Sequence, residues 1–449
     1  MKYLSVFMIL ACSLGIAFQA VAEPEKAAAE KRTVSDGKEI RIDPSTVTIT
    51  GETDKSPLSY APGEPMVFTL RLHFKGPKPT VPYFIAWRRS GDDGKQETGR
   101  APAFSPVVIR TSLDRPGFVR IYAKLIDGKN QNVVIKNHEA GSFNGGAAVQ
   151  AEKLKGTPAP ADFDAFWEKQ KARLAAVPIQ SEMKKVVSGK DADIYMVKVD
   201  CAGPRPVTGY LSIPHQAAEK SLPAEVVFDC YGFSGIRDLG PGSGPKNRLR
   251  FKVNAHGYDL RRDKSYYDAF LKKINPRGKG YAFDPEENSN PETAYFNGMA
   301  LRVIRALEFV KTLPQWNGKT LMLNGGSQGG LQTIWGAALD KDVTSASAAV
   351  PWCCDLAGAT RFGRLTGGWR LAWTEALEYY DPIHFASKIR CRFTIPRAGL
   401  GDYVCPPSGI AVFYNNLTCP KRIIWFQGST HGRVPKDPQK VEWKHAGTP

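Results

Sequence analysis

The chain has 449 residues, more than one ordinary domain needs, and an apolar content of 42% that can build a sizeable core. Its 61 Lys and Arg against 44 Asp and Glu give a net charge of +17, which could favour acidic polymers or simply solvate a basic surface. No zinc-finger spacing, aromatic RNA-binding strand or basic helix accompanies the charge, so a nucleic-acid partner is not expected.

The first residues have the pattern of a secretory signal peptide. Met1-Lys2 is a short basic start, Tyr3 to Phe18 is apolar, and Ala20-Val21-Ala22 fits the small-x-small cleavage rule. We expect residues 1–22 to be removed on export, with Glu23 as the mature start. The apolar run is too short for a good membrane anchor, and no later stretch is suited to span a bilayer. The sequence therefore predicts a secreted or periplasmic protein without a membrane span.

The next region is strand-like. Residues 23–38 are rich in Ala, Glu and Lys and are expected to be a flexible leader. Residues 39–155 mostly alternate apolar and polar positions between turn clusters, which predicts an immunoglobulin-like β-sandwich. Such a domain could bind carbohydrate, pack on the following domain or act as a spacer. The expected strands are 46–50, 66–74, 83–89, 105–113, 118–126 and 147–154.

A second domain is expected over residues 158–440. The proline-rich segment 158–162 marks the boundary, and Asp162 can cap a helix there. Strands then alternate with helices, which is typical of an open α/β sheet. The polar tail after Val434 is expected to be loose. The expected strands are 194–200, 208–214, 225–230, 251–257, 320–324, 345–351, 392–399 and 422–428, with a strong helix at 294–312.

One glycine-rich segment, Gly325-Gly326-Ser327-Gln328-Gly329-Gly330, joins the apolar strand 320–324 to a helix with one apolar face. This is the context that a G-x-S-x-G nucleophile elbow requires. The turn lifts the serine Oγ clear of the sheet and points a helix N-terminus at developing negative charge. Ser327 is therefore the predicted nucleophile, although a glycine-rich turn with an incidental serine would look similar.

A serine hydroxyl needs a base to remove its proton. In α/β-hydrolases the acid and then the histidine follow the serine, each on a loop after a strand. Asp402 follows the strand at 392–399 and His431 follows the strand at 422–428, so they are the predicted acid and base. Asp355, which follows an earlier strand, remains a competing acid.

The rest of the site can be placed in outline. An oxyanion hole needs two preorganised N–H donors, one from Gln328 after the nucleophile and one from the loop at 228–233. Trp352 could wall the acyl pocket or pack in the core, and His256 is expected near the site. No Cys/His set has zinc spacing, so no metal or cofactor is expected.

With these residues in view, the chain resembles the acetyl xylan esterase / cephalosporin-C deacetylase family of carbohydrate esterases, from about Ala159 to about Pro435. The matching segments are PADFDAFWEK, FDCYGFSG, NAHGYDLRRDKSYYDAF, YFNGMALRVIRALEFV, GGSQGG, AAVPWCCD, GLGDYVCPPS and STHG. The resemblance implies an α/β-hydrolase fold. It also implies a catalytic triad of Ser327, Asp402 and His431. The backbone N–H groups of Tyr231 and Gln328 would be the two oxyanion donors.

Two segments depart from the family's pattern. Asp229-Cys230 stands where the family has His-Gly, and Ala255-His256-Gly257 stands near the place of its Arg-Gly-Gln motif. The chain therefore looks like a divergent branch with an added N-terminal β-domain, and its oligomeric state stays open.

The sequence predicts an exported serine esterase that removes acetyl groups from sugar hydroxyls through an acetyl-enzyme, with an acetylated carbohydrate as its partner. A deacetylase of acidic glycans, of the pectin or sialic acid type, would suit the positive charge. A peptidase of the prolyl-oligopeptidase kind shares the elbow, but about 115 residues cannot build its usual propeller. A non-catalytic glycan-binding protein is the remaining alternative, and a complete triad argues against it.

Overall fold

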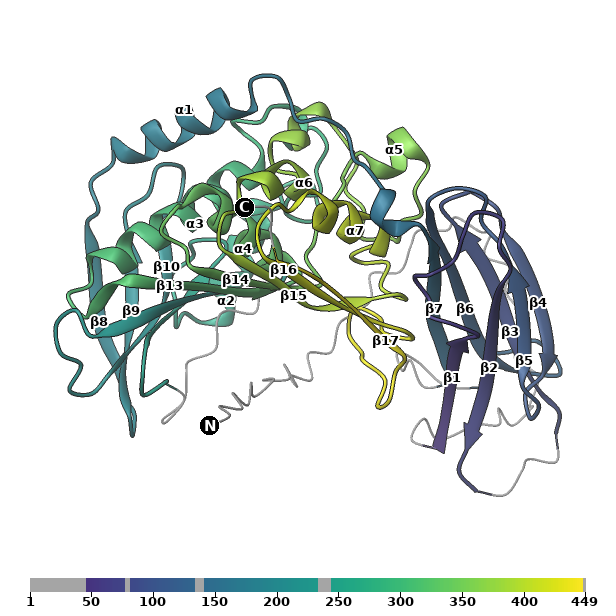
Figure 1. Ribbon diagram of the computed structural model, residues 1–449. Helices are drawn as coiled ribbons and strands as arrows, with labels where there is room; N and C mark the ends of the chain where they lie inside the picture. The colour runs from purple at the N-terminus through teal and green to yellow at the C-terminus, as the bar shows by residue number, and fades with distance from the viewer. Residues whose placement is uncertain (1–45, 77–80, 134–140, 233–243, 447–449) are drawn as a thin grey trace.

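The computed structural model describes residues 46–76, 81–133, 141–232 and 244–446 (Figure 1). The predicted signal peptide and leader, residues 1–38, lie outside these ranges. Among the described residues, none of the helices combines the length and the apolar character needed to cross a bilayer.

Residues 47–149, here called the N-terminal β-region, form two antiparallel sheets that share one core. Their strands are β1 (Val47–Thr53), β2 (Met66–Phe74), β3 (Tyr83–Gly91), β4 (Glu97–Pro102), β5 (Val107–Thr111), β6 (Gly117–Asp127) and β7 (Ser142–Val149). One sheet has the order β1-β2-β5 and the other β4-β3-β6-β7. Alternate side chains, among them Phe68, Ile85 and Ile121, point between the sheets and are fully buried.

Two strands of this region differ from the prediction. β4 was missed because ETGRAP lacks an alternating pattern and its residues are exposed or half-buried at the sheet edge. The strand expected at 147–154 ends at Val149, because Gln150 has a left-handed φ of 44° and the short 3-10 helix η2 (Ala151–Lys153) follows.

The rest of the chain builds one larger sheet, with ten strands among the described residues in the order β17-β16-β15-β14-β13-β11-β12-β10-β9-β8. These strands are β8 (Ser181–Ser188), β9 (Ala192–Val199), β10 (Val207–Pro214), β11 (Leu222–Phe228), β12 (Leu249–Asn254), β13 (Trp316–Gly326), β14 (Ser345–Ala349), β15 (Arg392–Gly399), β16 (Lys421–Phe426) and β17 (Lys440–His445). β11 to β16 are parallel, and antiparallel strands flank them on both sides. The carboxyl ends of the parallel strands therefore meet at one edge, where open α/β sheets place their sites.

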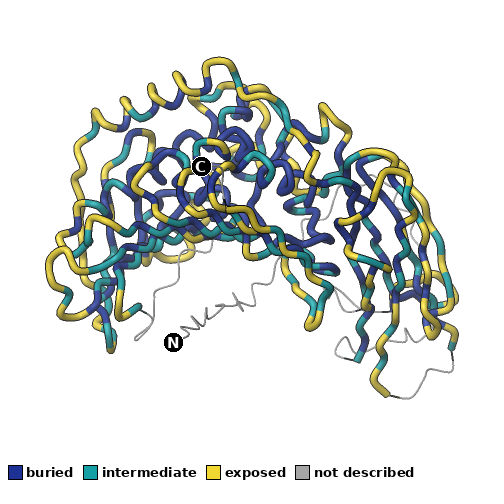
Figure 2. The backbone as a smooth tube through the Cα atoms, in the orientation of Figure 1, coloured by how far each residue is buried: buried dark blue, intermediate teal, exposed yellow. Residues whose placement is uncertain are grey.

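Helices accompany this sheet, and α1, α3, α4, α6 and α7 lie on one side of it (Figure 1). The helices are α1 (Phe163–Ala175), α2 (Lys264–Ile274), α3 (Tyr295–Thr312), α4 (Gln328–Leu339), α5 (Gly358–Phe362), α6 (Pro382–Phe385) and α7 (Pro407–Asn416), with short 3-10 turns η3 (Glu287–Ser289), η4 (Glu375–Tyr379) and η5 (Ala386–Lys388). α4 is buried on nearly every face because it packs on the sheet and also contacts α3 and α6. Figure 2 shows that buried residues predominate in this layer and alternate with exposed ones along the strands of the β-region.

Three expectations need correction here. The edge strand β8 was missed, since its residues are mostly exposed. The tail after Val434 is not simply loose, because β17 pairs with β16 along the sheet edge and extends past residue 440. Asp162 does stand at the N-cap of α1, but its side chain accepts a hydrogen bond from the Tyr379 hydroxyl instead of capping the helix.

Candidate active site

Ser327 stands between β13 and α4 in a strained backbone conformation, with φ 53° and ψ −119°. Its N–H donates to Ala349 C=O at 2.9 Å, and its C=O accepts from Trp352 N–H at 3.1 Å. The flanking glycines allow a close approach, because a Cβ on Gly329 would lie 2.2 Å from Phe228 O. These contacts hold Ser327 in a backbone conformation whose strain costs about 1–3 kcal/mol, as expected of a nucleophile elbow.

The three predicted triad residues come together as a hydrogen-bonded chain. His431 Nε2 lies 3.0 Å from Ser327 Oγ, and His431 Nδ1 lies 2.9 Å from Asp402 Oδ2. A carboxylate only accepts hydrogen bonds, so Nδ1 carries the proton and Nε2 is free to accept one from the serine hydroxyl. The arrangement is that of a nucleophile, a base and an orienting acid.

Asp402 is fixed on both oxygens. Its Oδ1 accepts from the N–H groups of Val404 and Cys405, each at 3.0 Å, while Oδ2 contacts His431. The residue is fully buried. The competing acid Asp355 forms a buried ion pair with Arg364 instead, so Asp402 is the partner of the histidine.

The two predicted oxyanion donors lie on neighbouring segments. Gln328 opens α4, so its N–H has no carbonyl partner within the helix. Tyr231 lies just beyond β11, whose last carbonyl, on Phe228, packs against the first turn of α4. In the described part of the chain neither backbone N–H has a hydrogen-bond partner, so both are available to a ligand oxygen.

His256 does not line the cavity described below but lies behind the oxyanion loop, where it is buried. Its Nε2 donates to Gly232 C=O at 2.9 Å, and its Nδ1 accepts from the Tyr295 hydroxyl at 2.7 Å. Burial lowers the pKa of His256 to about 3, with Arg302 and Arg205 acting in the same direction. His256 is therefore a neutral support for the loop that carries Tyr231.

Tyr281 supports the same loop and was missed from the sequence, where no motif marks it. Its hydroxyl accepts from Gly232 N–H at 3.0 Å and donates to Gln328 Oε1 at 3.0 Å. Its ring stacks on Tyr231 with centroids 4.1 Å apart. Tyr281 therefore links the two segments that carry the predicted oxyanion donors.

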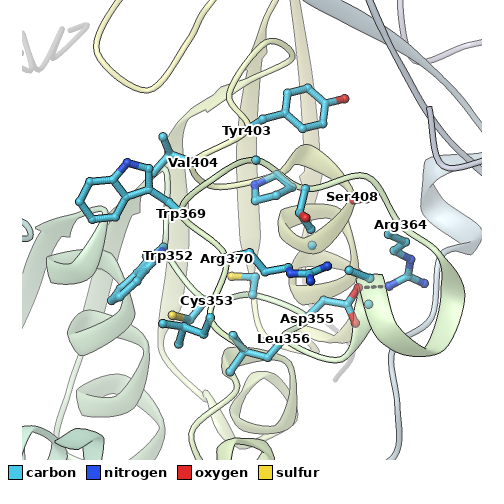
Figure 3. A pocket seen from close by; sticks show the side chains of 18 residues that line it. Trp352, Cys353, Asp355, Leu356, Arg364, Trp369, Arg370, Tyr403, Val404 and Ser408 are labelled. Carbon is cyan, nitrogen blue, oxygen red and sulfur yellow. Dashed lines mark hydrogen bonds and ion pairs between the residues drawn. The ribbon is translucent and has the colours of Figure 1, made fainter. Parts of the chain in front are cut away.

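Trp352 is buried, as one of the two expectations for it requires, and it also lines a cavity of about 50 Å³ whose lining includes none of the triad residues. Its ring contacts Tyr231 edge-on at 5.6 Å. Tyr403, which follows Asp402, lines the same cavity, and Figure 3 shows Arg370 pointing into it.

Two groups of described residues bring metal-type donors together. In the first, Asp402 and His431 are already bonded to each other, and burial raises the pKa of the third donor, Cys405, so its thiol stays protonated. In the second, His384 is bonded to Glu378 at 2.8 Å, and Asp381 accepts several backbone N–H groups. Each group is thus internally satisfied, and neither is needed as a metal site.

A family model described as acetyl xylan esterase (AXE1) matches residues 151–367 and 372–446. The chain belongs to the acetyl xylan esterase family. The match begins after the N-terminal β-region, which is therefore an addition to the part that the family model covers.

Individual relatives agree with membership of the acetyl xylan esterase family. The acetyl esterase Axe7A of Xylanibacter ruminicola is 28% identical over 334 residues, which cover 70% of this chain and 71% of the relative. The acetyl xylan esterase from Paenibacillus sp. R4 has a TM-score of 0.53 at 23% identity, covering 64% of this chain and 94% of that one. Acetyl xylan esterase 1 from Thermoanaerobacterium sp. JW/SL YS485 has a TM-score of 0.51 at 20% identity, covering 64% and 94%. These structures support the α/β-hydrolase fold, and the family makes the protein a carbohydrate esterase.

Proposed function

We propose that this protein is a serine esterase that removes acetyl groups from the hydroxyls of polysaccharides or oligosaccharides through an acetyl-enzyme intermediate. The observation that carries the proposal is the pair of hydrogen bonds, 3.0 and 2.9 Å long, that joins Ser327 to His431 and His431 to Asp402. Membership of the acetyl xylan esterase family and the acetyl esterase of X. ruminicola support an acetylated carbohydrate as substrate.

In the first half of the reaction, His431 Nε2 takes the proton of Ser327 Oγ as the oxygen attacks the ester carbonyl. The negative charge that forms on the carbonyl oxygen is stabilised by the backbone N–H groups of Gln328 and Tyr231. His431 then gives its proton to the sugar oxygen, and the C–O bond to the sugar breaks. Asp402 stabilises the imidazolium throughout without taking a proton itself.

In the second half, water replaces the sugar. His431 removes a proton from the water, whose oxygen attacks the acetyl carbonyl of the acetyl-enzyme, and the same N–H groups hold the second oxyanion. The proton returns to Ser327 Oγ as acetate leaves. These steps use only side chains, backbone donors and water.

The surroundings of the serine suit a sugar ester. Trp369 contacts the Tyr231 ring at 4.9 Å and remains 36% exposed, so its ring offers an apolar surface beside the site on which a sugar can stack.

We also propose that the protein is exported and that its N-terminal β-region is an immunoglobulin-like sandwich. The first 22 residues have the pattern of a cleaved signal. The three-stranded and four-stranded sheets over a shared core support the second assignment.

A second candidate, a deacetylase of acidic glycans, is favoured by Arg370. This arginine lines the cavity that Trp352 and Tyr403 also line, and it is exposed. Across the ranges that the structure describes, it has no acidic partner, since the nearby Asp355 is paired with Arg364. A free guanidinium at this position could bind the carboxylate of a uronic or sialic acid.

The test is acetate release from acetylated xylan, acetylated pectin and a small chromogenic acetate. Wild type should release acetate and Ser327→Ala should not, while Ser181→Ala, exposed on β8, should match wild type. A preference for pectin that Arg370→Gln removes would establish the second candidate. If wild type releases no acetate from any of the three, the deacetylase proposal is wrong.

A further inference from the structure

The loops that carry Asp402 and His431 lie against the N-terminal β-region, of which β6 and β7 are the nearest strands (Figure 1). Asp402 follows β15 and His431 follows β16. Gly401 N–H donates to Ser429 C=O at 3.0 Å, so the two loops are tied to each other. A contact that moves one loop therefore affects both members of the acid–base pair.

Gln427, four residues before His431, joins its loop to β7 by two hydrogen bonds. Its Oε1 accepts from Gly146 N–H at 2.9 Å, and its Nε2 donates to Gly146 C=O at 2.8 Å. Gln427 is 1% exposed, so water cannot replace either bond. The side-chain amide of Gln427 is bonded to both the N–H and the C=O of Gly146. The two bonds together fix the direction of the loop as well as its distance from β7.

Gly401, immediately before Asp402, lies directly on the backbone of β7. A Cβ at this position would be 1.7 Å from the carbonyl oxygen of Asn144, closer than any real contact allows. Leu400, one residue earlier, has its carbonyl 3.0 Å from the place where a Cβ on Gly146 would stand. The approach of the acid loop to the β-region therefore leaves no space for a side chain on either glycine.

Tyr403, on the other side of Asp402, is also held by the β-region. The guanidinium of Arg120, on β6, lies 4.3 Å from the ring centre of Tyr403. Arg120 Nε also donates to Asn144 Oδ1 at 2.9 Å, which sets the position of the guanidinium over the ring. A cation placed on an aromatic face in a buried setting is a directional contact.

We propose that the N-terminal β-region is a positioning element of the active site, and that Gln427 and Gly401 are the residues through which it sets the place of His431 and Asp402. The inference rests on the proposed function of these two residues as base and acid. It gives the β-region a catalytic role in this chain that a spacer or a carbohydrate-binding domain would not have.

The test compares substitutions that break these contacts with matched substitutions that do not. Gln427→Ala should lower kcat about 10-fold and Gly401→Ala about 100-fold, with KM nearly unchanged, because a displacement of about 1 Å is enough to misalign the base. Gln439→Ala is the matched control, since the Gln439 side chain also bridges the two regions, through Thr53 and the Lys55 carbonyl, while its backbone carbonyl, which accepts from Gln427 N–H, is kept in the variant. Gly128→Ala is the second control, because its nearest new contact, Pro82, is 3.8 Å away.

A double-mutant cycle separates positioning from general loss of stability. In an Asp402→Asn background, Gln427→Ala should change kcat by less than about twofold, because the orientation that it disturbs is already lost. If Gln427→Ala lowers kcat by the same factor in both backgrounds, or no more than Gln439→Ala does, the positioning role is refuted.

A second readout keeps this test independent of the substrate. The rate at which a small organophosphonate ester inactivates the protein by reacting with Ser327 Oγ depends on the same base and acid, whatever the natural ester is. Gln427→Ala should slow this reaction about 10-fold in the wild-type background and leave it unchanged in the Asp402→Asn background. A wild type that reacts with the phosphonate but releases no acetate would overturn the proposed substrate and leave the positioning role standing.

Discussion

The two halves of the active site are held by different parts of the molecule. Ser327 and Gln328 rest on β13, α4 and the Tyr281 hydroxyl, and the neighbouring loop of Tyr231 rests on Tyr281 and His256 of the same domain. The loops of Asp402 and His431 rest instead on β6 and β7 of the N-terminal β-region.

This difference separates what the family model covers from what this chain adds. The nucleophile half, and the acid and base themselves, lie within the matched residues 151–367 and 372–446. The partner of the acid and base loops lies before residue 151. An added domain is therefore tolerated at the acid–base side, where it packs onto loops, and not at the elbow, which is enclosed by the sheet and α4.

The substitution with the largest expected effect acts directly on the acid and base. Asp402→Asn should lower kcat about 10⁴-fold, because an amide can hold His431 in the tautomer that cannot accept the serine proton. Asp355→Asn is the matched control: it breaks the buried pair with Arg364 and should cost stability, but it leaves both hydrogen bonds of His431 in place. Steady-state kinetics with thermal unfolding distinguish the two, and an equal loss of kcat in both variants would contradict the assignment of Asp402.

A smaller effect is expected in the nucleophile half. Tyr281→Phe removes the hydroxyl that accepts from Gly232 N–H and donates to Gln328 Oε1, so the oxyanion loop loses one support but keeps its donors. Losing a donor outright costs about 10²–10³ in kcat, so losing a support should cost about 10-fold with KM little changed. Tyr414→Phe is the control, because the Tyr414 hydroxyl is buried on α7 and has no hydrogen-bond partner among the described residues.

Whether kcat or KM changes in Tyr281→Phe decides which role Tyr281 has. If Tyr281→Phe raised KM instead of lowering kcat, Tyr281 would belong to substrate binding and would not be a support of the loop that carries Tyr231.

The sequence predicted the residues of the site better than it predicted what holds them. Ser327, Asp402 and His431 could be placed because each follows a recognisable strand, and parallel strands bring their carboxyl ends to one edge. Tyr281 and Gln427 could not, because each acts through one or two hydrogen bonds to a glycine backbone far away in the chain. Such contacts leave no spacing or periodicity in the sequence.

The same contrast explains the errors in the fold. The central strands were found because their apolar residues stand out, whereas β4, β8 and β17 are edge strands with mostly exposed residues. In β17 only Val441 and Trp443 alternate with polar residues, which is too short a pattern to mark a strand in a polar tail. Their position is decided by pairing with a neighbouring strand, as when β17 pairs with β16.

The smallest expected effect is one of stability, and it concerns His256 in the nucleophile half. Burial, with Arg302 and Arg205 nearby, lowers the pKa of His256 from 6.5 to about 3. The unfolded chain therefore binds a proton on this residue at a pH where the folded chain does not. The stability that neutral His256 contributes is fully present above pH 6.5 and is lost as the pH falls toward 3, at up to about 1.4 kcal/mol per pH unit.

The measurement is denaturant unfolding of wild type and His256→Gln between pH 7.5 and 5. Glutamine can still donate to Gly232 C=O but does not titrate, so the advantage of wild type over the variant should shrink steadily below pH 6.5. A difference that stays constant across this range would mean that folding does not lower the pKa of His256, and a difference that grows as the pH falls would mean that the folded chain holds the proton, which would place a cation behind the loop of Tyr231. In that second case both halves would use a cation near a loop, since Arg120 already lies over the ring of Tyr403 in the acid loop.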